Sequence, residues 1–532
     1  MPEKVNAALN RAFMGLARRA ERIDRSRLVD TFVDVGSLFT LLSSVDHQVI
    51  FGRRGTGKTH VLNYLSGARL DDGDVVVYVD LSNIGSSGGI YSDQDIPITE
   101  RATRLLVDTL LAVHDSLFTY FVEHAEELDL SRSGPLLDRF ANSITQVRVV
   151  GEVETQVKQA QSKAQEDSSG LRTAISAESL ELALETENKE TTTDSFSAST
   201  ERRGRERHTV HFGSTRRIWE EITEIIRPRS VWVLLDEWSS VPIELQPYLA
   251  DLVRRSIFPV RGVVTKIAAI EQRSSFSFPQ DKGNYIGIEL GADAAADVNL
   301  DDFMVFDNDA TRARNFYKGL LFKHLKSTEI FQKSALGIDS EVTFLRTAFT
   351  QITTFDELVR ASEGVPRDAI NIVIQAAQYA GSEPLSVDHV RRAADAWYQR
   401  DKEGAVKERE NAKSLLHWII QEVIGSRRAR AFLLGSDEKD DLIEALFDAR
   451  IIHILKKNIS THDEPGKRFD VYKLDYGCYV NFISTAKSPQ GLLQLDDDGG
   501  EGHSQFIEVP PDDYRAIRRA ILRLSEFYQG AR

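Results

Sequence analysis

The sequence predicts an α/β fold in which helices flank a parallel sheet, followed by a helical region and a small C-terminal domain. Three observations support this prediction. Several short apolar runs lack polar alternation, as strands buried on both faces of a parallel sheet do: 49–51, 74–80, 231–235 and 263–270. From about residue 310 the strand patterns give way to helical periodicity. The last part of the chain combines helical stretches with a candidate β-hairpin.

Length and composition limit the class of protein. A chain of 532 residues exceeds what a single core supports, so we expect about two to four domains. Its 41% hydrophobic and 28% charged residues are ordinary for a soluble globular protein. No apolar run approaches the roughly 20 residues that span a bilayer, and Met1 to Arg27 lacks the apolar core of a secretory signal. We therefore expect no membrane helix.

Cysteine content and net charge narrow the compartment and the partners. A single cysteine, Cys478, rules out intrachain disulfides and fits a reducing cytoplasm, where we expect the protein to act. The formal net charge of −15 argues against a wholly basic nucleic-acid-binding surface. Any contact with nucleic acid must therefore come from a local basic patch.

The N-terminal part precedes the first predicted strand. Helical spacing predicts one amphipathic helix over Asn6 to Arg27, and a second helix opens at 37–42. Between them, Phe32 and Val33 stand in a short extended piece. Plain core packing is one interpretation of these two apolar side chains.

The first predicted strand leads into a phosphate-binding loop. The segment from Gly52 to Thr59 reads G-x-x-x-x-G-K-T, and a helical pattern follows from Val61. Glycines let backbone N–H groups converge on phosphate oxygens, and the following helix N-terminus adds positive potential. Lys58 would reach the β- and γ-phosphates, while the Thr59 hydroxyl would ligate Mg²⁺. The predicted nucleotide-binding residues here are Gly52, Arg53, Arg54, Gly55, Thr56, Gly57, Lys58, Thr59 and His60.

Two segments between the loop and the next strand differ in character. Residues 99–127 predict a long helix with a Leu, Val and Phe stripe. Between about 151 and 208 apolar residues thin out, which predicts a mobile insertion or an extended surface arm. The basic cluster at 202–207 could meet phosphates, although a solvated linker explains it as well.

A pair of carboxylates ends the next buried strand. The run VWVLL, residues 231–235, is followed by Asp236 and Glu237, which places both acids at the carboxyl edge of the sheet, beside the phosphate loop. Asp236 would hold the Mg²⁺ shell, and Glu237 would orient and deprotonate an attacking water. We expect the loop and the acids to meet across neighbouring parallel strands with a triphosphate between them.

A glycine–proline joint marks the predicted helical lid. Gly364 would end one helix and Pro366 would begin the next, over 367–380. Arg367 then stands on the first helical turn, facing back towards the nucleotide. A guanidinium there can sense the γ-phosphate and move the lid when that phosphate leaves.

Taken together, the motifs FGRRGTGKTH, VWVLLDEW and GVPRDA resemble those of an AAA+ P-loop ATPase. The resemblance covers roughly Val29 to Gln399 and is closest to the origin-recognition-complex/cell-division-control group of initiator-type ATPases, including related bacterial proteins. It implies that ATP and Mg²⁺ are the ligands. It also implies the following roles: Lys58 and Thr59 bind phosphate and Mg²⁺, Asp236 holds the metal, Glu237 is the base, and Arg367 is the second sensor.

The same resemblance suggests roles for less distinctive residues. The segment before the first strand often packs on adenine in such proteins, which makes Phe32 and Val33 candidates. The strand at 263–270 would end in a polar residue that touches the γ-phosphate or the water, a place that Gln272 or Glu271 would fill. Arg273 would be either an arginine finger for a neighbouring subunit or a surface side chain.

The C-terminal region predicts a winged-helix-like domain. Helical stretches at 412–424 and 437–449 precede two strand-like runs, at 451–456 and 469–474. Basic side chains flank this hairpin and could contact the phosphates of a DNA backbone: Lys456, Lys457, Lys467 and Arg468. Acidic residues in the same region favour a protein partner equally well.

The sequence therefore predicts three parts: an AAA+ α/β core over 1–305, a helical lid over 306–404 and the winged-helix-like domain over 405–532. We expect an ATP-binding and ATP-hydrolysing switch that acts on double-stranded DNA or on a partner protein complex. The alternative is a STAND-like signalling or anti-phage defence ATPase that forms oligomers, with partner proteins or with itself, without binding DNA.

Overall fold

The computed structural model describes the chain apart from residues 1, 19–24, 35, 37, 85–88, 90, 129, 145–146, 158–199, 209–210, 281–283, 305–308, 335, 408, 428, 461–463, 481–520 and 531–532. The run at 85–89, GSSGG, which by its composition predicts a flexible loop after the strand at 74–80, lies largely outside the described residues.

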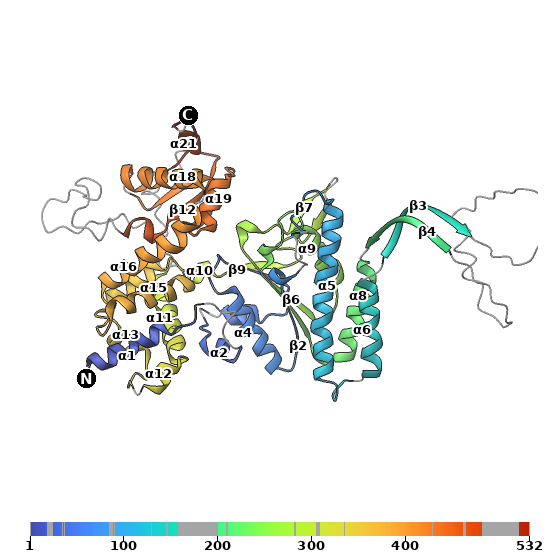
Figure 1. Cartoon of the computed structure of the whole chain (residues 1–532), viewed down its shortest axis with the longest axis horizontal. Helices are drawn as coiled ribbons and strands as arrows, with labels where there is room; N and C mark the ends of the chain where they lie inside the picture. The colour runs from blue at the N-terminus through green and yellow to red at the C-terminus, as the bar shows by residue number, and fades with distance from the viewer. Residues whose placement is uncertain are drawn as a thin grey trace, which may run out of the picture.

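A five-stranded parallel sheet forms the centre of the molecule, in the order β2-β5-β6-β1-β9 (Figure 1). Its strands are β1 (Gln48–Phe51), β2 (Val75–Asp80), β5 (Val231–Asp236), β6 (Val263–Ala269) and β9 (Ala295–Asn299). The prediction of a parallel sheet flanked by helices is thus confirmed. Four of these strands are the apolar runs singled out in the sequence; β9 was not anticipated, since its sequence AADVN carries little apolar signal.

Alternate residues of each strand face two different apolar layers. In β5, Val231, Val233 and Leu235 pack in one cluster, whereas Trp232 and Leu234 pack in the other. The first layer is formed by α5 (Ile98–Glu123), α6 (Leu130–Ile144), α8 (Phe212–Ile226) and α9 (Gln246–Ser256). The second is formed by α4 (Lys58–Asp71) and the lid helices. Helices on both faces explain why these strands are continuously apolar.

The strand order corrects one expectation. The loop strand β1 and the acid-bearing strand β5 are not neighbours, because β6 lies between them and pairs with both. Parallel strands nonetheless present their carboxyl ends on one edge, so the loop after β1 and the acids after β5 can still face a common ligand.

The N-terminal helix is shorter than predicted. Instead of one helix over 6–27, the structure has α1 (Pro2–Met14) and α2 (Arg25–Thr31). The second predicted helix, at 37–42, is present as α3 (Leu38–Leu42). α1 packs on lid helices, where Asn10 donates hydrogen bonds to the carbonyls of Gly381 and Glu383, both at 2.9 Å.

The long helix α5 covers the face of the sheet opposite α4 and the lid helices. By length and composition alone it is apolar enough to cross a membrane, and in the described part of the chain it is the one helix that meets that test. Its apolar face packs on β2, α6 and α9, with Leu105, Leu110 and Leu117 buried. This packing is what a core helix of a folded domain shows.

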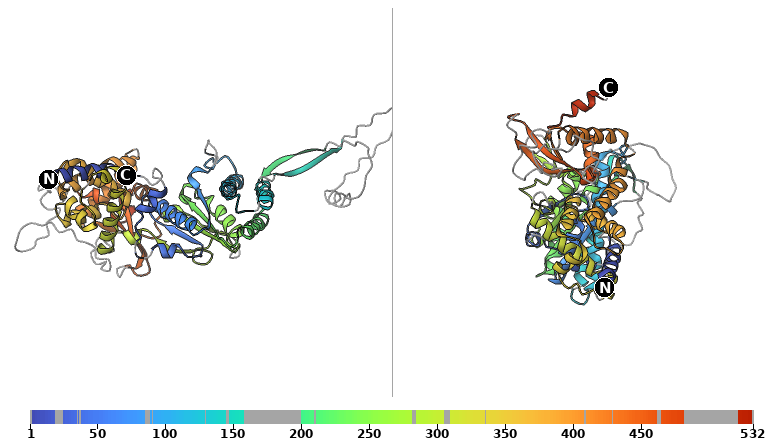
Figure 2. Two further views of the ribbon diagram at one scale, coloured as in Figure 1. Left: turned by 90° about the horizontal axis from the view of Figure 1, so that it is seen from below. Right: turned by 90° about the vertical axis from the view of Figure 1, so that its left-hand side faces the viewer.

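The predicted insertion begins and ends as a two-stranded antiparallel ribbon of β3 (Val147–Val157) and β4 (Thr200–His208). The ribbon projects away from α6 and α8 (Figures 1 and 2). For these ends of the insertion the extended-arm interpretation holds, and β4 contains the basic cluster. A second small hairpin joins β7 (Ser277–Pro279) to β8 (Tyr285–Gly287) beside α9.

A short helix, α10 (Asp301–Met304), follows β9, and the predicted helical region is present from residue 310 onwards. Its members are α11 (Ala310–Lys326), α12 (Glu329–Lys333), α13 (Glu341–Ala348), α14 (Ile352–Ala361), α15 (Pro366–Ala380), α16 (Val387–Trp397) and α17 (Gly404–Val406). As predicted, Pro366 begins α15, and Gly364 has the left-handed φ of 76° that ends a helical segment without steric strain.

The C-terminal region contains α18 (Glu410–Ile420), β10 (Ala431–Gly435), α19 (Asp441–Asp448), β11 (Ile452–Ser460), β12 (Arg468–Leu474) and α21 (Leu524–Gly530). Its antiparallel sheet has the order β10-β12-β11. This region shares one apolar cluster with the lid. A Cβ added at Gly477 would lie 2.3 Å from the Tyr398 ring, so the two parts are in close contact.

Candidate functional site

A cavity of about 740 Å³ opens at the carboxyl edge of the parallel sheet, between the sheet and the lid. Its volume lies within the range of small-molecule and cofactor sites. It is lined by the phosphate loop, by the ends of β2 and β5, and by the first turn of α15. The described structure thus brings Lys58, Asp236, Glu237 and Arg367 to one opening.

The loop between β1 and α4 has a conformation that needs glycine. Gly55 and Gly57 have φ values of 90° and 96°, which side chains rarely adopt. A Cβ at Gly52 would lie 2.5 Å from the Thr56 hydroxyl. That hydroxyl donates to the Arg53 carbonyl at 2.9 Å and closes the loop on itself. The glycines therefore determine the loop shape as the motif predicted.

Lys58 is buried at the first turn of α4. Its ammonium group donates to the carbonyls of Gly52 at 2.9 Å and Arg53 at 3.1 Å. Burial lowers the pKa of Lys58, while the charges of Glu237, Asp301 and Asp236 oppose that shift. A partly desolvated ammonium next to carboxylates is suited to gain from an added polyanion.

Asp236 is held rigidly at the end of β5. One carboxylate oxygen accepts from the Tyr78 hydroxyl at 2.6 Å, and the other accepts from the Glu237 backbone N–H at 2.9 Å. The side chain is 2% exposed. Each oxygen retains a lone pair for a further donor, so Asp236 could still receive a hydrated cation.

Glu237 occupies a strained backbone position. Its φ of 54° lies in the left-handed region that glutamate rarely adopts, and such strain concentrates at functional sites. Burial, and then the neighbouring Asp236 charge, raise the pKa of Glu237, against the opposing effect of Lys58. A carboxylate with a raised pKa beside a cavity is the expected form of a general base.

The lid meets the loop directly. The backbone N–H of Arg367 donates to the Gly55 carbonyl at 3.3 Å, and a Cβ at Gly55 would lie 3.2 Å from the Arg367 Cβ. Arg367 therefore lines the cavity from the first turn of α15, as its predicted role requires.

Among the remaining predicted residues, Arg54, Gly57, Thr59 and His60 line the same cavity. The other predicted residues do not. Gly52, Arg53 and Gln272 line a separate, smaller cavity, as does Glu271, the other candidate for the place of Gln272. Thr56 lines neither of these two cavities. Phe32 stacks on Tyr64 with ring centroids 3.8 Å apart, and Val33 packs against Gly319, so both have the core-packing role.

The part of the cavity beyond the loop has a different lining that the sequence did not indicate. Leu28, Leu320 and Ile370 come from α2, α11 and α15, and His60 and His324 lie beside them. The two imidazole rings are 6.0 Å apart, and burial lowers the pKa of both, to about 3 for His324. Apolar side chains and neutral rings suit a planar heterocycle better than a charged group.

Other polar residues line the cavity without having been assigned to it from the sequence. Among them are Asp80 and Tyr78 of β2. Arg273, which the sequence offered as an arginine finger or a surface residue, comes from the 3₁₀ turn after β6 and lines the cavity of its own chain. An acid at the end of the strand next to β5 was a usable signal for Asp80. Arg273 points to the same cavity as Glu237, whereas its neighbour Gln272 does not.

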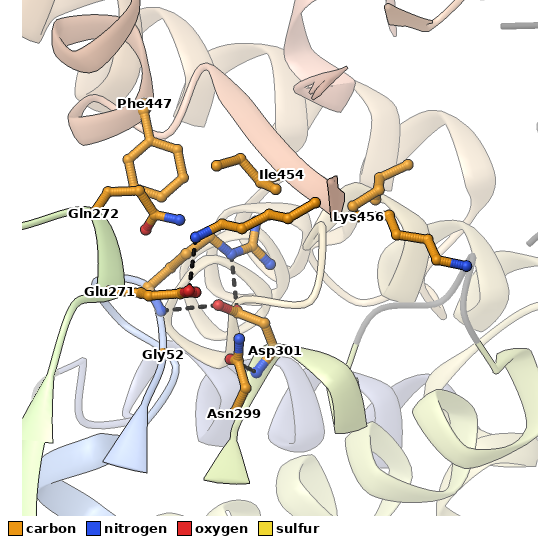
Figure 3. Close-up of a pocket in the computed structure, with 11 residues that line it drawn as sticks. Gly52, Glu271, Gln272, Asn299, Asp301, Phe447, Ile454 and Lys456 are labelled. Carbon is orange, nitrogen blue, oxygen red and sulfur yellow. Dashed lines mark hydrogen bonds and ion pairs between the residues drawn. The ribbon is translucent and has the colours of Figure 1, made fainter. Parts of the chain in front are cut away.

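The smaller cavity, about 210 Å³, lies between the loop and the C-terminal region. Figure 3 shows Glu271 and Asp301 on one side and Ile454 and Lys456 on the other. Gln272 lies near Phe447 in that view. Gln272 therefore lies at an interface between the core and the C-terminal region.

The described residues contain no group of three or more His, Cys, Asp and Glu side chains that could hold a metal. Proteins usually bind Mg²⁺ through one or two oxygen ligands together with substrate phosphates. The Thr59 hydroxyl and Asp236 carboxylate are ligands of that kind, and both line the large cavity.

One comparison with known proteins covers the segment that contains the loop. Residues 16–83 match the family model described as ORC-CDC6-like. The match confirms the predicted resemblance to ORC-CDC6-like AAA+ ATPases; it covers the phosphate loop and β2, while the acid pair and Arg367 lie outside it. No curated protein matches the chain.

Among solved structures, the chain is similar to the Orc1 protein of Aeropyrum pernix in complex with DNA. The two share 14% sequence identity, the match covers 84% of this chain and 93% of that chain, and the TM-score is 0.29. A TM-score this low carries no argument about arrangement or function.

Proposed function

We propose that this chain is an AAA+ switch that binds and hydrolyses Mg²⁺-ATP in the large cavity. The observation that supports the proposal is the convergence of Lys58, Asp236, Glu237 and Arg367 on one opening. The phosphate loop would bind the triphosphate, and the leucine–histidine end of the cavity would receive the base. Cytoplasmic action is part of the proposal.

Each polar side chain has a proposed task. Thr59 and Asp236 would hold Mg²⁺, which supplies charge neutralisation on the phosphates when bound. Glu237 would accept a proton from the attacking water, and Lys58 would stabilise charge on the transferred group. Arg367 would contact the γ-phosphate from the lid. For the sensor after β6 we propose Arg273 in place of Gln272, because Arg273 lines the cavity.

ATP binding and phosphate release by purified full-length protein test the proposal. Lys58→Ala should weaken ATP binding by about 100-fold, since charge-assisted bonds to phosphate are lost. Glu237→Gln should bind ATP like the parent but lose about 100- to 10,000-fold in turnover. Lys318→Ala, which breaks a 3.0 Å ion pair with Glu341 on the lid surface, is the matched control. Equal binding and turnover in all four proteins would refute the mechanism.

For the downstream target we propose a partner protein rather than duplex DNA. A DNA-reading helix-turn-helix inserts its second helix into the major groove. Between β10 and β11 the described residues hold one helix, α19, and all its charged side chains are acidic. Two of the basic residues near the hairpin are engaged within the chain: Lys457 pairs with Glu271 and Lys467 with Glu464, both at 2.7 Å.

A duplex titration at several salt concentrations distinguishes the two targets. The protein-partner proposal predicts weak binding to DNA, unaffected by Lys456→Ala with Lys457→Ala. Tight binding with a steep salt dependence that these substitutions reduce would instead support a DNA-acting initiator.

A further inference from the structure

Arg53 lies behind the phosphate loop, where it joins three parts of the chain. Its side chain is 6% exposed. Nε donates to Asp301 at 2.8 Å, and the backbone N–H of Arg53 donates to the other Asp301 oxygen at 3.0 Å. Nη2 donates to the Glu363 carbonyl at 2.8 Å, and Nη1 donates to Nδ1 of His453. One loop residue thus contacts the core, the lid and the C-terminal region.

His453 acts as a neutral link in this arrangement. Because Arg53 donates to Nδ1, that nitrogen must carry a lone pair, and Nε2 then donates to Asp475 at 3.0 Å. Burial, followed by the Arg53 charge, lowers the pKa of His453 to about 3. The imidazole therefore connects the loop arginine to Asp475 of the C-terminal region.

A buried set of ion pairs extends this contact to the start of the lid helix. Asp368, next to Arg367, pairs with Lys402 at 2.8 Å and with Arg450. Lys402 also pairs with Asp475, and Lys473 pairs with the Glu363 carboxylate at 2.8 Å. All of these side chains are less than 10% exposed. Breaking one member of such a set leaves its partners with uncompensated charge.

The C-terminal region also forms ion pairs with the turn after β6. Glu271 pairs with Lys457 at 2.7 Å, and Arg273, which also lines the large cavity, pairs with Asp448 of α19. Figure 3 shows Glu271 facing β11. The C-terminal region therefore contacts the phosphate loop, the start of the lid helix and the turn after β6 at once.

We infer that Arg53 and His453 are positioning residues through which the docked C-terminal region fixes the phosphate loop and raises its affinity for nucleotide. The inference rests on the proposed function and adds its regulation. Coupling between binding and docking is reciprocal, so bound nucleotide must also tighten the docking of the C-terminal region.

The first test measures the affinity of full-length variants for a fluorescent ATP analogue with Mg²⁺. His453→Ala and Arg53→Ala should each weaken binding about tenfold. The double variant should be no weaker than the weaker-binding single variant, because both remove one contact. His453→Gln should restore binding, since a carboxamide can accept from Arg53 and donate to Asp475. Arg314→Ala, which breaks a bidentate pair with Asp356 inside the lid, should bind like the parent.

The second test uses the single cysteine as a reporter of docking. Cys478 is buried where the C-terminal region packs on the lid, with its Sγ 3.5 Å from the Tyr398 hydroxyl. It follows Asp475 by three residues. A non-hydrolysable ATP analogue should slow labelling of Cys478 by a thiol reagent about tenfold in the parent. In His453→Ala the analogue should leave the labelling rate unchanged. Thermal unfolding establishes that each variant is folded.

The outcomes separate this inference from the proposed function. A parent chain that binds no ATP analogue overturns the proposed function. A parent that binds, together with parent-like affinity in His453→Ala, additive losses in the double variant or faster Cys478 labelling with nucleotide, overturns the inference alone. Should His453→Ala not fold, Arg53→Lys takes its place, because one ammonium cannot reach Asp301, Glu363 and His453 together.

Discussion

The two sides of the phosphate loop hold buried charges in different ways. On one side, Lys58 is 7% exposed and faces an open cavity together with Asp236 and Glu237. On the other side, Arg53 is 6% exposed and is bonded to Asp301, Glu363 and His453. Exposure alone does not distinguish the two cations. What distinguishes them is how their donors are used: the Arg53 guanidinium is bonded to three distant parts of the chain beside the smaller cavity, whereas Lys58 is bonded to carbonyls of its own loop and faces the larger cavity.

This difference distinguishes the residues that we propose do chemistry from the residues that hold the fold. A charge whose partners fill its hydrogen-bonding capacity stabilises one arrangement, and its loss mainly affects folding or docking. A charge beside a cavity reduces stability unless something binds there, and its loss mainly affects binding or turnover. Four predictions test this contrast, from the largest effect to the smallest.

The largest effect should come from two buried aspartates given the same substitution. Asp368→Asn removes the charge that Lys402 and Arg450 share, so it should lower the free energy of unfolding by about 3–5 kcal/mol. Asp236→Asn should lower it by less than about 1 kcal/mol while abolishing Mg²⁺-dependent ATP turnover. Denaturant unfolding and a phosphate-release assay measure both. Equal losses of stability would remove the distinction between the two sides.

The next effect tests the close packing of the lid on the C-terminal region. Gly477→Ala places a Cβ 2.3 Å from the Tyr398 ring and should destabilise the chain by about 1–3 kcal/mol. Gly134→Ala, in α6 with nothing within 4 Å of the added Cβ, should be neutral or stabilising. Thermal melts of both variants check this. A melting temperature like that of the parent for Gly477→Ala would mean that Gly477 does not pack closely against Tyr398.

Acid should weaken the contact of the C-terminal region with the phosphate loop, because His453 lies in that contact. A histidine whose folded pKa is lowered to about 3 contributes stability above its unfolded pKa near 6.5, and this contribution is lost as the pH falls below that value. Between pH 6.5 and pH 5.5 its share of the loss is about 1 kcal/mol. His453→Gln should therefore show a shallower pH dependence of unfolding over this interval. If the free energy of unfolding has the same pH dependence in parent and variant, His453 is not the neutral side chain that connects Arg53 to Asp475.

The smallest effect concerns the cavity side. Burial raises the pKa of Glu237, so its charged form disfavours folding as the pH rises through the folded pKa. Glu237→Gln should therefore raise the melting temperature at pH 7 slightly, on the order of a degree or two. The difference should vanish at acidic pH, where the parent is protonated. A lower melting temperature at pH 7 would show that Glu237 is a structural residue.

Much of the fold and of the site followed from local sequence. The glycine spacing of the loop, the apolar runs of four strands, and the Gly364–Pro366 joint each depend on neighbouring residues in the chain, so their patterns are readable without a structure. The cavity-lining residues Lys58, Asp236, Glu237 and Arg367 were identified this way, because each follows directly from such a local signal.

The remainder was decided by contacts between distant segments. Strand order placed β6 between β1 and β5, turned Arg273 towards the cavity and left Gln272 at an interface. Packing assigned Phe32 to the core, and it brought His453 within hydrogen-bonding distance of Arg53 across 400 positions. The sequence by itself determined the glycine-dependent loop and the ionisable residues that follow the strands and begin the lid helix. Only the tertiary structure decided which buried charges are left facing a cavity, because that depends on partners that no local pattern specifies.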